Sequence, residues 1–368
     1  MLTCWQVTLR GGVITVWSRW WAGAGALLSA VVAAVFLAAP GSPAAPAASA
    51  RPAAHAASAA SAASAAHAAP GAQAAPGAQA APAGRAAPAA PAAARVAQQP
   101  LVGIPAGPVV ALGDSYTAGD LMPLWLSSQP LGCLRSTASY AVQVAAALGA
   151  AGEFTDAACG GAGVKEMTSA QPTYLNGVNP PQLSVLLPTD SVVMLTLGGD
   201  DLGFFNTLNK CMELSITDVD GSPCEAYYTK GGADQIAAAI AAEAPKLTAV
   251  LEAIQTLAPR ARVLLVGYPD MFPLHGGCWP VVPITDGDIR WLLGLELRFN
   301  AMLSQAAAAT GVTFVDTFAP TIGHDFCQSS NAKDVEGLIP TSLAAPFHMN
   351  ARGQAVAAAA VLAALRAG

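Results

Sequence analysis

A serine stands at the point where an apolar run of the chain ends. Residues 109–112 are Val-Val-Ala-Leu, and Gly-Asp-Ser follows immediately, so the hydroxyl of Ser115 comes directly after the run. An apolar run that ends in glycine is typical of a buried strand leading into a tight turn. Open α/β sheets bind ligands at the carboxyl ends of their strands. We therefore expect Ser115 to be a nucleophile served by a base and an oxyanion site. The alternative is a serine that only caps the next helix.

His348 is the candidate base. It follows a loop that contains proline and precedes an Ala-rich segment at 350–366, so it can lie at the sheet edge beside Ser115. Histidine titrates near neutrality, which suits a group that first accepts a proton and later returns it. The rival base is His324, for which a structural role beside Cys327 is the preferred interpretation. A surface histidine without catalytic function is the alternative for His348.

Strands and helices alternate along the part of the chain that must position these residues. Strands are expected at 109–112, 154–158, 191–197, 262–267 and 312–315. Helices are expected at 139–150, 233–257, 288–310 and 350–366. Pro245 is expected to break or bend the second of these helices. This alternation predicts an α/β fold in which helices cover both faces of a parallel central sheet, a three-layer α/β/α arrangement.

The amino-terminal part of the chain has a different composition. From about residue 38 to 99 it consists almost entirely of Ala and Pro, with no aromatic residue to bury, which predicts a disordered linker. Ahead of it, Arg10 and Arg19 precede an apolar run at 20–39. That layout fits a secretory signal peptide, which is preferred, or an uncleaved membrane anchor. The predicted divisions are a signal peptide or anchor (1–50), an Ala/Pro-rich linker (51–100) and an exported domain (101–368).

The charge of the domain argues against one class of partner. Before position 100 the chain has five arginines and no acidic residue, so the remaining 12 basic residues face all 23 acidic ones, a balance of −11. Binding to nucleic acid needs a basic surface and is therefore not expected.

Six of the seven cysteines lie in the predicted domain: Cys133, Cys159, Cys211, Cys224, Cys278 and Cys327. An even number of cysteines in an exported domain indicates disulfides, and six cysteines allow 15 pairings. No Cys-x-x-Cys pair occurs, so a zinc site is not expected, nor is any other metal or cofactor.

Four short blocks occur in order along the domain. They are Gly113-Asp114-Ser115-Tyr116, Cys159-Gly160-Gly161-Ala162, Gly198-Gly199-Asp200-Asp201-Leu202-Gly203-Phe204 and Phe347-His348-Met349-Asn350-Ala351-Arg352-Gly353. Together they resemble the blocks of the SGNH (GDSL-type) hydrolases. Cys-Leu-Arg-Ser at 133–136 and Gly-His-Asp-Phe-Cys at 323–327 further resemble the secreted actinobacterial esterases and lipases of that superfamily. The resemblance covers residue 109 to the carboxyl terminus and implies a flavodoxin-like sheet topology.

The resemblance also implies roles for individual residues. Ser115 attacks an ester carbonyl, and His348 removes the hydroxyl proton. The backbone N–H groups of Ser115 and Gly161 and the side chain of Asp200 surround the developing oxyanion. The cysteines of this branch form three sequential bridges, which correspond here to Cys133–Cys159, Cys211–Cys224 and Cys278–Cys327.

Two residues depart from the family pattern. Asp200 stands where the family has Asn, and an ionised carboxylate cannot donate a hydrogen bond to an oxyanion, whereas a protonated one can. Ala345 stands where the family often has the Asp that orients the histidine. A backbone carbonyl of segment 338–342 is expected to orient His348 instead, which leaves a Ser–His dyad. The carboxylates considered less suitable are Asp325 and Asp334.

The sequence therefore predicts a secreted serine esterase or lipase that hydrolyses carboxylic esters, above all acyl esters of lipids, through an acyl-Ser115 intermediate. Apolar loops at 121–126, 271–274 and 279–284 are expected to line an acyl pocket, with plain core or rim as their alternative role. The expected partner is a small-molecule or lipid ester, with membrane or cell wall near the amino-terminal segment, and the chain is expected to be a monomer. The alternatives are a carbohydrate or cell-wall O-acetylesterase on the same fold and a catalytically impaired binding module.

Overall fold

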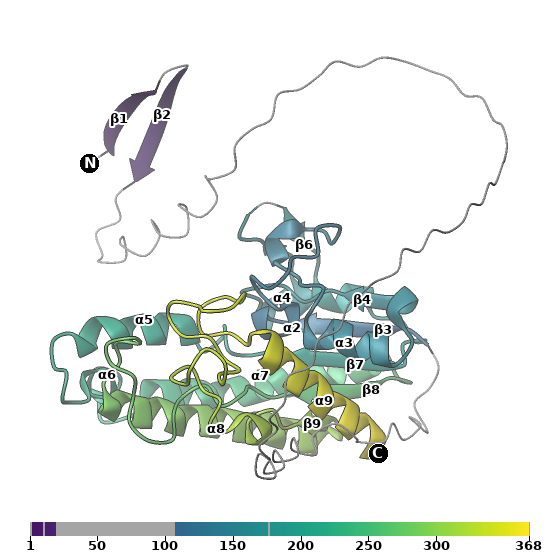
Figure 1. Ribbon diagram of the computed structural model, residues 1–368. Coiled ribbons are helices and arrows are strands. Elements are labelled where there is room, and N and C mark those ends of the chain that lie inside the picture. Colours follow the sequence, from purple (N-terminus) through teal and green to yellow (C-terminus); the bar gives the residue numbers. More distant parts are fainter. Residues whose placement is uncertain (1, 10–11, 20–106, 176, 368) are drawn as a thin grey trace, which may run out of the picture. The chain divides into compact units, whose positions relative to one another are not determined.

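The computed structural model describes residues 2–9, 12–19, 107–175 and 177–367 (Figure 1). In the amino-terminal part, strands β1 (Leu2–Leu9) and β2 (Gly12–Arg19) pair in antiparallel fashion. The apolar run and the Ala/Pro-rich segment that follow lie outside the described residues, so the signal peptide or anchor and the linker stay predictions. Among the described residues, no helix is long and apolar enough to cross a membrane.

The carboxyl-terminal part is built on a parallel sheet of five strands, which confirms the predicted fold class. In sheet order these are β4 (Phe154–Asp156), β3 (Val109–Gly113), β7 (Val192–Thr196), β8 (Arg262–Val266) and β9 (Thr313–Val315). If these five strands are numbered by their order along the chain, their order across the sheet is 2-1-3-4-5, the flavodoxin-like arrangement. Every residue of β3 and β7 is buried, which explains their uninterrupted apolar sequences. The strand order reverses between β3 and β7, and such a switch point is where this architecture binds ligands.

Helices cover both faces of the sheet, as the alternating pattern predicts (Figure 1). Helices α3 (Tyr140–Ala147) and α9 (Ala351–Ala367) pack together on one face, and α7 (Gln235–Leu257) and α8 (Asp286–Thr310) pack together on the other. Pro245 lies inside α7 without breaking it, so the expected helix is one element of 23 residues.

The ends of the long helices follow from local sequence. The side chain of Asp234 accepts a hydrogen bond from the N–H of Ala237 and caps α7, and Thr285 caps α8 through the N–H of Asp288. Gly311 ends α8 in the left-handed conformation, which glycine adopts without a steric penalty.

The connections after the strands contain further elements that the sequence analysis did not predict. They are α2 (Ser115–Ala118), α4 (Lys165–Thr168), α5 (Phe204–Ser215), α6 (Pro223–Thr229), the antiparallel pair β5 (Gln171–Pro172) and β6 (Val178–Asn179), and 3-10 turns at 131–133, 151–153, 182–185 and 319–321. Three disulfides join Cys133 to Cys159, Cys211 to Cys224, and Cys278 to Cys327, the pairing that the resemblance implies. The second of them ties α5 to α6.

Candidate active site

Ser115 lies where β3 ends and the short helix α2 begins. Asp114 caps this helix by accepting a 2.9 Å hydrogen bond from the N–H of Tyr116, and its own N–H donates to the carbonyl of Thr196 at the end of β7. Gly113 has a φ of 115°, and a Cβ there would run into the same Thr196 carbonyl. The turn is thus held across the switch point, and it presents the 8% exposed Ser115 to a pocket.

His348 lies 233 residues after Ser115 in the sequence, and its side chain contacts the serine. Its Nε2 lies 2.7 Å from the serine Oγ, and its Nδ1 lies 2.8 Å from the carbonyl oxygen of Pro346. Because a carbonyl only accepts, Nδ1 carries the proton and Nε2 is free to accept one from the serine. Burial lowers the pKa of His348, with the bond to Pro346 opposing the shift, so the imidazole is neutral at pH 7.

The carbonyl that orients His348 differs from the expected one. A backbone carbonyl does take the place of a carboxylate, but it belongs to Pro346, two residues before the histidine, and not to segment 338–342. That segment is turned toward another partner, because the N–H of Thr341 donates a 2.7 Å hydrogen bond to the carboxylate of Glu336.

The other candidates for a catalytic role lie outside the dyad. The Nδ1 of His324 is 2.5 Å from the carbonyl oxygen of Ala332, in line with the structural role preferred for it. Asp325 accepts a hydrogen bond from the N–H of Cys327, and Asp334 forms an ion pair with Arg352. In the described part of the chain, no group of three or more His, Cys, Asp or Glu side chains is arranged to hold a metal ion.

The glycine turn that follows β4 lies against the end of β3. The N–H of Cys159 donates a 3.0 Å hydrogen bond to the carbonyl of Gly113. Gly161 has a φ of 75°, and a Cβ there would lie 2.6 Å from the hydroxyl of Tyr174, so both backbone and space favour glycine. Among the described residues, no acceptor takes a hydrogen bond from the N–H of Gly161 or of Ser115. Two backbone donors are therefore free to bind an oxyanion.

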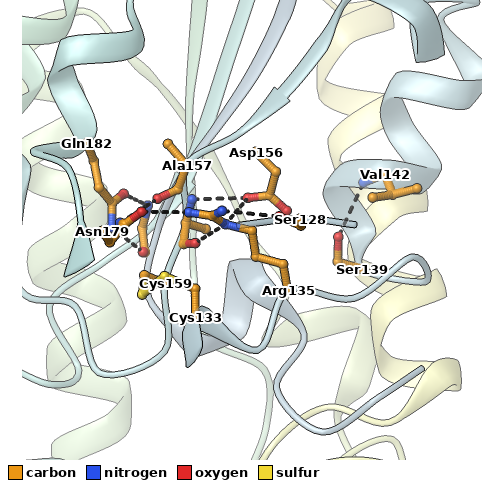
Figure 2. Close-up of polar contacts among 12 residues, drawn as sticks. Ser128, Cys133, Arg135, Ser139, Val142, Asp156, Ala157, Cys159, Asn179 and Gln182 are labelled. Atoms are coloured by element: carbon orange, nitrogen blue, oxygen red, sulfur yellow. Dashed lines mark hydrogen bonds and ion pairs between the residues drawn. A yellow bond between two sulfur atoms is a disulfide. The ribbon is translucent and has the colours of Figure 1, made fainter. Parts of the chain in front are cut away.

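A buried arginine fixes this glycine turn (Figure 2). The Nε of Arg135 donates to the carbonyl of Ala158 at 2.6 Å, and a terminal nitrogen donates to the side-chain oxygen of Asn179 at 2.8 Å. Asp156 lies 3.8 Å from the same Nε; burial raises the pKa of this carboxyl to about 7, although the arginine opposes the shift. Because Ala158 directly precedes the disulfide-bonded Cys159, the arginine and the disulfide together hold the turn in place.

Asp200 stands beside the dyad in the same pocket. Its carboxyl is accessible from the open cleft, yet the protein atoms around it desolvate the charge and raise its pKa to about 6, and the negative charges of Asp201 and Glu166 add to the shift. Below pH 6 most molecules therefore carry an O–H donor at this position. At higher pH the ionised carboxylate can only accept.

Two tyrosines that the sequence analysis did not single out connect these residues. The hydroxyl of Tyr268 donates to the carboxylate of Asp114 and accepts a 2.9 Å hydrogen bond from the N–H of Gly199. The hydroxyl of Tyr116 donates to the carbonyl of Phe347 at 2.7 Å. Tyr268 follows the end of β8, where polar residues of this architecture gather, and that position was the available signal. Tyr116 adjoins the serine, but its partner is 231 residues away.

An apolar pocket leads away from Ser115, with about 820 Å³ of empty space when the open solvent at its mouth is included. Its walls come mainly from α5, α7 and α8, through Phe204, Ile236, Ile240, Leu292, Leu295 and Phe299. Of the three loops expected to form it, only 271–274 contributes, through Met271. The loops at 121–126 and 279–284 do not line this pocket; Val282 and Ile284 are buried in the core instead.

The fold and the site match a known family. The model of the GDSL-like lipase/acylhydrolase family matches residues 111–356. The chain belongs to this family. This chain is 34% identical to Lipase 2 of Streptomyces coelicolor over 260 residues, which cover 69% of this chain and 84% of the relative.

Two solved structures share the fold of this chain. The crystal structure of phospholipase A1 from Streptomyces albidoflavus NA297 superposes with a TM-score of 0.58 at 26% identity, covering 70% of this chain and 98% of that one. The extracellular lipase from Streptomyces rimosus superposes with a TM-score of 0.57 at 27% identity, covering 70% and 100%. The GDSL-like hydrolase is thus an SGNH-type carboxylic ester hydrolase of the esterase/lipase class.

Proposed function

We propose that this GDSL-like hydrolase is a secreted lipase that cleaves acyl esters of lipids, with Ser115 as nucleophile and His348 as general base. The observation that carries the proposal is the 2.7 Å contact between the serine Oγ and the histidine Nε2 at the mouth of an apolar pocket. A nucleophile paired with an oriented base is the arrangement that acyl transfer requires.

The geometry supports a two-step mechanism without a metal or cofactor. His348 takes the proton of Ser115 as Oγ attacks the ester carbonyl, and the resulting oxyanion accepts hydrogen bonds from the N–H groups of Ser115 and Gly161 and from protonated Asp200. The imidazolium then gives its proton to the leaving alcohol, which frees the acyl-enzyme. In the second step His348 removes a proton from water as the water oxygen attacks the acyl carbonyl. The bond to Oγ then breaks, the imidazolium returns its proton to Ser115, and the acid leaves. The carbonyl of Pro346 keeps Nδ1 protonated throughout.

The pocket supports a long acyl chain as the acid part of the substrate. Its walls are aliphatic and aromatic side chains from three helices, which offer little to a polar group and much to methylenes. Two similar proteins are a lipase and a phospholipase A1, which agrees with lipid esters as the substrate class.

Exposed apolar side chains around the dyad support delivery of the substrate from a lipid surface. The ring of Phe205 lies 6.4 Å from that of Phe347, beside the histidine, and a 2.8 Å backbone hydrogen bond joins the segments that carry Leu121 and Leu343. Contiguous apolar residues that face water typically mark an interaction surface. The exposed apolar residues of these segments and of the loop beside Gly161 are Leu121, Tyr174, Phe205 and Leu343, of which Phe205 lines the pocket.

Secretion and domain organisation belong to the same proposal. Residues 1–50 act as the export signal or anchor, 51–100 as a linker, and 101–368 as the catalytic domain. The similar lipase from Streptomyces rimosus is described as extracellular, and three disulfides in the domain suit an oxidising compartment. A monomer, with its linker keeping it near membrane or wall, completes the proposal. An O-acetylesterase is less favoured because an acetyl group leaves the pocket empty.

An activity-based probe tests the assignment of the nucleophile. A fluorophosphonate is expected to label the wild-type protein and the Ser184→Ala control, whose serine is exposed and does not line the pocket, and to leave Ser115→Ala unlabelled. Because the labelling reaction needs an activated serine, His348→Ala is expected to slow it by at least about a hundredfold. Equal labelling of Ser115→Ala would show that another residue is the nucleophile.

A series of p-nitrophenyl esters tests the acyl specificity. Each methylene that enters the pocket contributes about 0.8 kcal/mol, so kcat/KM is expected to rise about fourfold per methylene until the pocket is full. Ile240→Phe narrows the pocket and is expected to lower kcat/KM for dodecanoyl ester while leaving acetyl ester within about twofold. A preference for acetyl over octanoyl ester in the wild-type protein would defeat the lipase assignment and favour an acetylesterase.

A further inference from the structure

The position of His348 relative to Ser115 must be fixed by residues outside the loop that carries the histidine. No carboxylate orients the imidazole, because position 345 is Ala, and the only acceptor at Nδ1 among the described residues is the carbonyl of Pro346, which belongs to the same loop. A carbonyl two residues from the ring moves with it. The placement of Nε2 against Ser115 therefore depends on whatever holds residues 346–348 relative to the serine.

Tyr116 makes two contacts with this loop. Its hydroxyl donates a 2.7 Å hydrogen bond to the carbonyl of Phe347, the residue between the proline and the histidine. Its ring stacks on the imidazole of His348, with the centroids 4.8 Å apart and the planes inclined by 28°. Phe347 has a φ of 62°, a costly backbone conformation for a bulky residue, and such a conformation persists only when surrounding contacts enforce it.

Tyr116 is itself fixed on the side of the nucleophile. Only 6% of it is exposed, and its N–H donates to the carboxylate of Asp114, which in turn accepts from the hydroxyl of Tyr268. The ring of Tyr268 meets that of Tyr116 edge to face, with centroids 4.8 Å apart. One side chain thus bridges the turn that holds the serine and the loop that holds the base.

We propose that Tyr116 is a positioning residue that takes over the orienting role of the absent carboxylate. Its hydroxyl holds the carbonyl of Phe347 and so sets the height of the imidazole over Ser115. Its ring limits the tilt of the imidazole and faces the imidazolium that forms during the reaction, which favours the protonated state by a cation–π interaction. The proposal rests on the assignment of Ser115 and His348 as the catalytic dyad.

Two substitutions separate the two contributions. Tyr116→Phe keeps the ring and removes one hydrogen bond, so kcat on a soluble ester is expected to fall about three- to tenfold, with KM within about twofold and the acid limb of the pH profile unchanged. Tyr116→Leu also removes the ring, so kcat is expected to fall further and the acid limb to move to lower pH, because the imidazolium loses the facing π-system. Asp114, Asp200, Glu296 and Tyr268, the other titratable groups around this site, are the same in both variants.

Tyr140→Phe is the matched control. Tyr140 is also fully buried, and its hydroxyl contacts Thr117 and Thr196 without touching the dyad, so kcat is expected to stay within about twofold. The proposal is overturned if Tyr116→Phe retains full kcat, if the loss lies in KM, or if Tyr140→Phe loses as much. It is also overturned if Tyr116→Leu leaves the acid limb in place. Failure of the dyad itself shows separately, as unchanged fluorophosphonate labelling in Ser115→Ala.

Discussion

Asp200 and His348 place opposite demands on pH. The histidine must be neutral to act as a base, and burial lowers its pKa, so it can act as a base at mildly acidic as well as at neutral pH. Asp200 can donate to an oxyanion only when protonated, which its pKa of about 6 allows at and below that pH. The two requirements are therefore met together in a window at mildly acidic pH. Above it, the active site keeps its base but exchanges a hydrogen-bond donor for a negative charge beside the developing oxyanion.

Asp200→Asn should remove the upper limit of this window. At pH 8 only about one molecule in a hundred of the wild-type protein carries the Asp200 proton, whereas the amide of Asn donates at every pH. Since one oxyanion donor is worth about 10²–10³ in rate, kcat at pH 8 is expected to rise by at least tenfold, with little change at pH 5. The measurement is the pH profile of kcat on a soluble ester.

Asp201→Asn is the matched control for this experiment. The negative charge of Asp201 raises the pKa of Asp200, so its removal is expected to shift the alkaline limb to lower pH, the opposite direction. An Asp200→Asn protein that is no faster than wild type at pH 8 would contradict the placement of residue 200 at the oxyanion.

At the scale of elements, the loop before α9 is held by a short antiparallel pairing and a buried charge. Val335 and Met349 form an isolated bridge, and the N–H of Glu336 donates a 2.9 Å hydrogen bond to the carbonyl of His348. The carboxylate of Glu336 is fully buried and lies 2.8 Å from the ammonium of Lys333. A side chain without any contact to substrate thereby helps to hold the base.

Glu336→Gln should destabilise the protein in a pH-dependent way. Burial alone would raise the pKa of Glu336, but hydrogen bonds from Lys333, Asn350 and the N–H of Thr341 outweigh it and lower the pKa to about 2. Because the folded-state value lies below the ordinary one, this carboxylate stabilises the fold above pH 4.5 and loses that contribution as pH falls toward 2. Breaking such a buried pair costs about 3 kcal/mol, because the lysine is left uncompensated.

Urea denaturation at pH 7 and at pH 3 measures this difference between wild type and Glu336→Gln. The gap in unfolding free energy is expected to be smaller at pH 3 than at pH 7. Adding Lys333→Met to the variant should recover part of the loss at pH 7, since no buried charge then lacks a partner. A gap that is equal at both pH values would contradict the role of the ionised carboxylate.

The parts of the fold and site that local sequence encodes could be predicted. The buried apolar runs of β3 and β7, each followed by a glycine turn, predict the central strands of the sheet. Ser115, Gly161 and Asp200 could be found because each lies in a short sequence motif of the family. Contacts between distant segments could not be read in this way. The Pro346 carbonyl depends on how the histidine loop folds back, and the predicted segment 338–342 does not supply it. The acyl pocket depends on how α5, α7 and α8 pack, and of the three predicted loops only 271–274 lines it.

At the scale of the whole molecule, the catalytic machinery is contained in one part of the chain. The five strands of the parallel sheet, the three disulfides, the dyad and the pocket all lie between residues 109 and 367. The Ala/Pro-rich segment 38–99 has no aromatic and almost no branched aliphatic side chain to add to the core of this part. The amino-terminal segment is therefore expected to affect the location of the enzyme and not its catalytic activity.

Deleting residues 1–100 tests this division. The shortened protein, produced in an oxidising compartment so that its disulfides form, is expected to keep the thermal transition of the longer one and its kcat on a soluble ester within about twofold, because every buried contact of the sheet is retained. Activity on lipid particles is the informative comparison. If the segment only tethers the enzyme, the two proteins hydrolyse a dispersed lipid equally in free solution, and they differ only on cells that retain the full-length form. A lower melting temperature or a loss of activity on the soluble ester would show instead that the amino-terminal residues complete the fold.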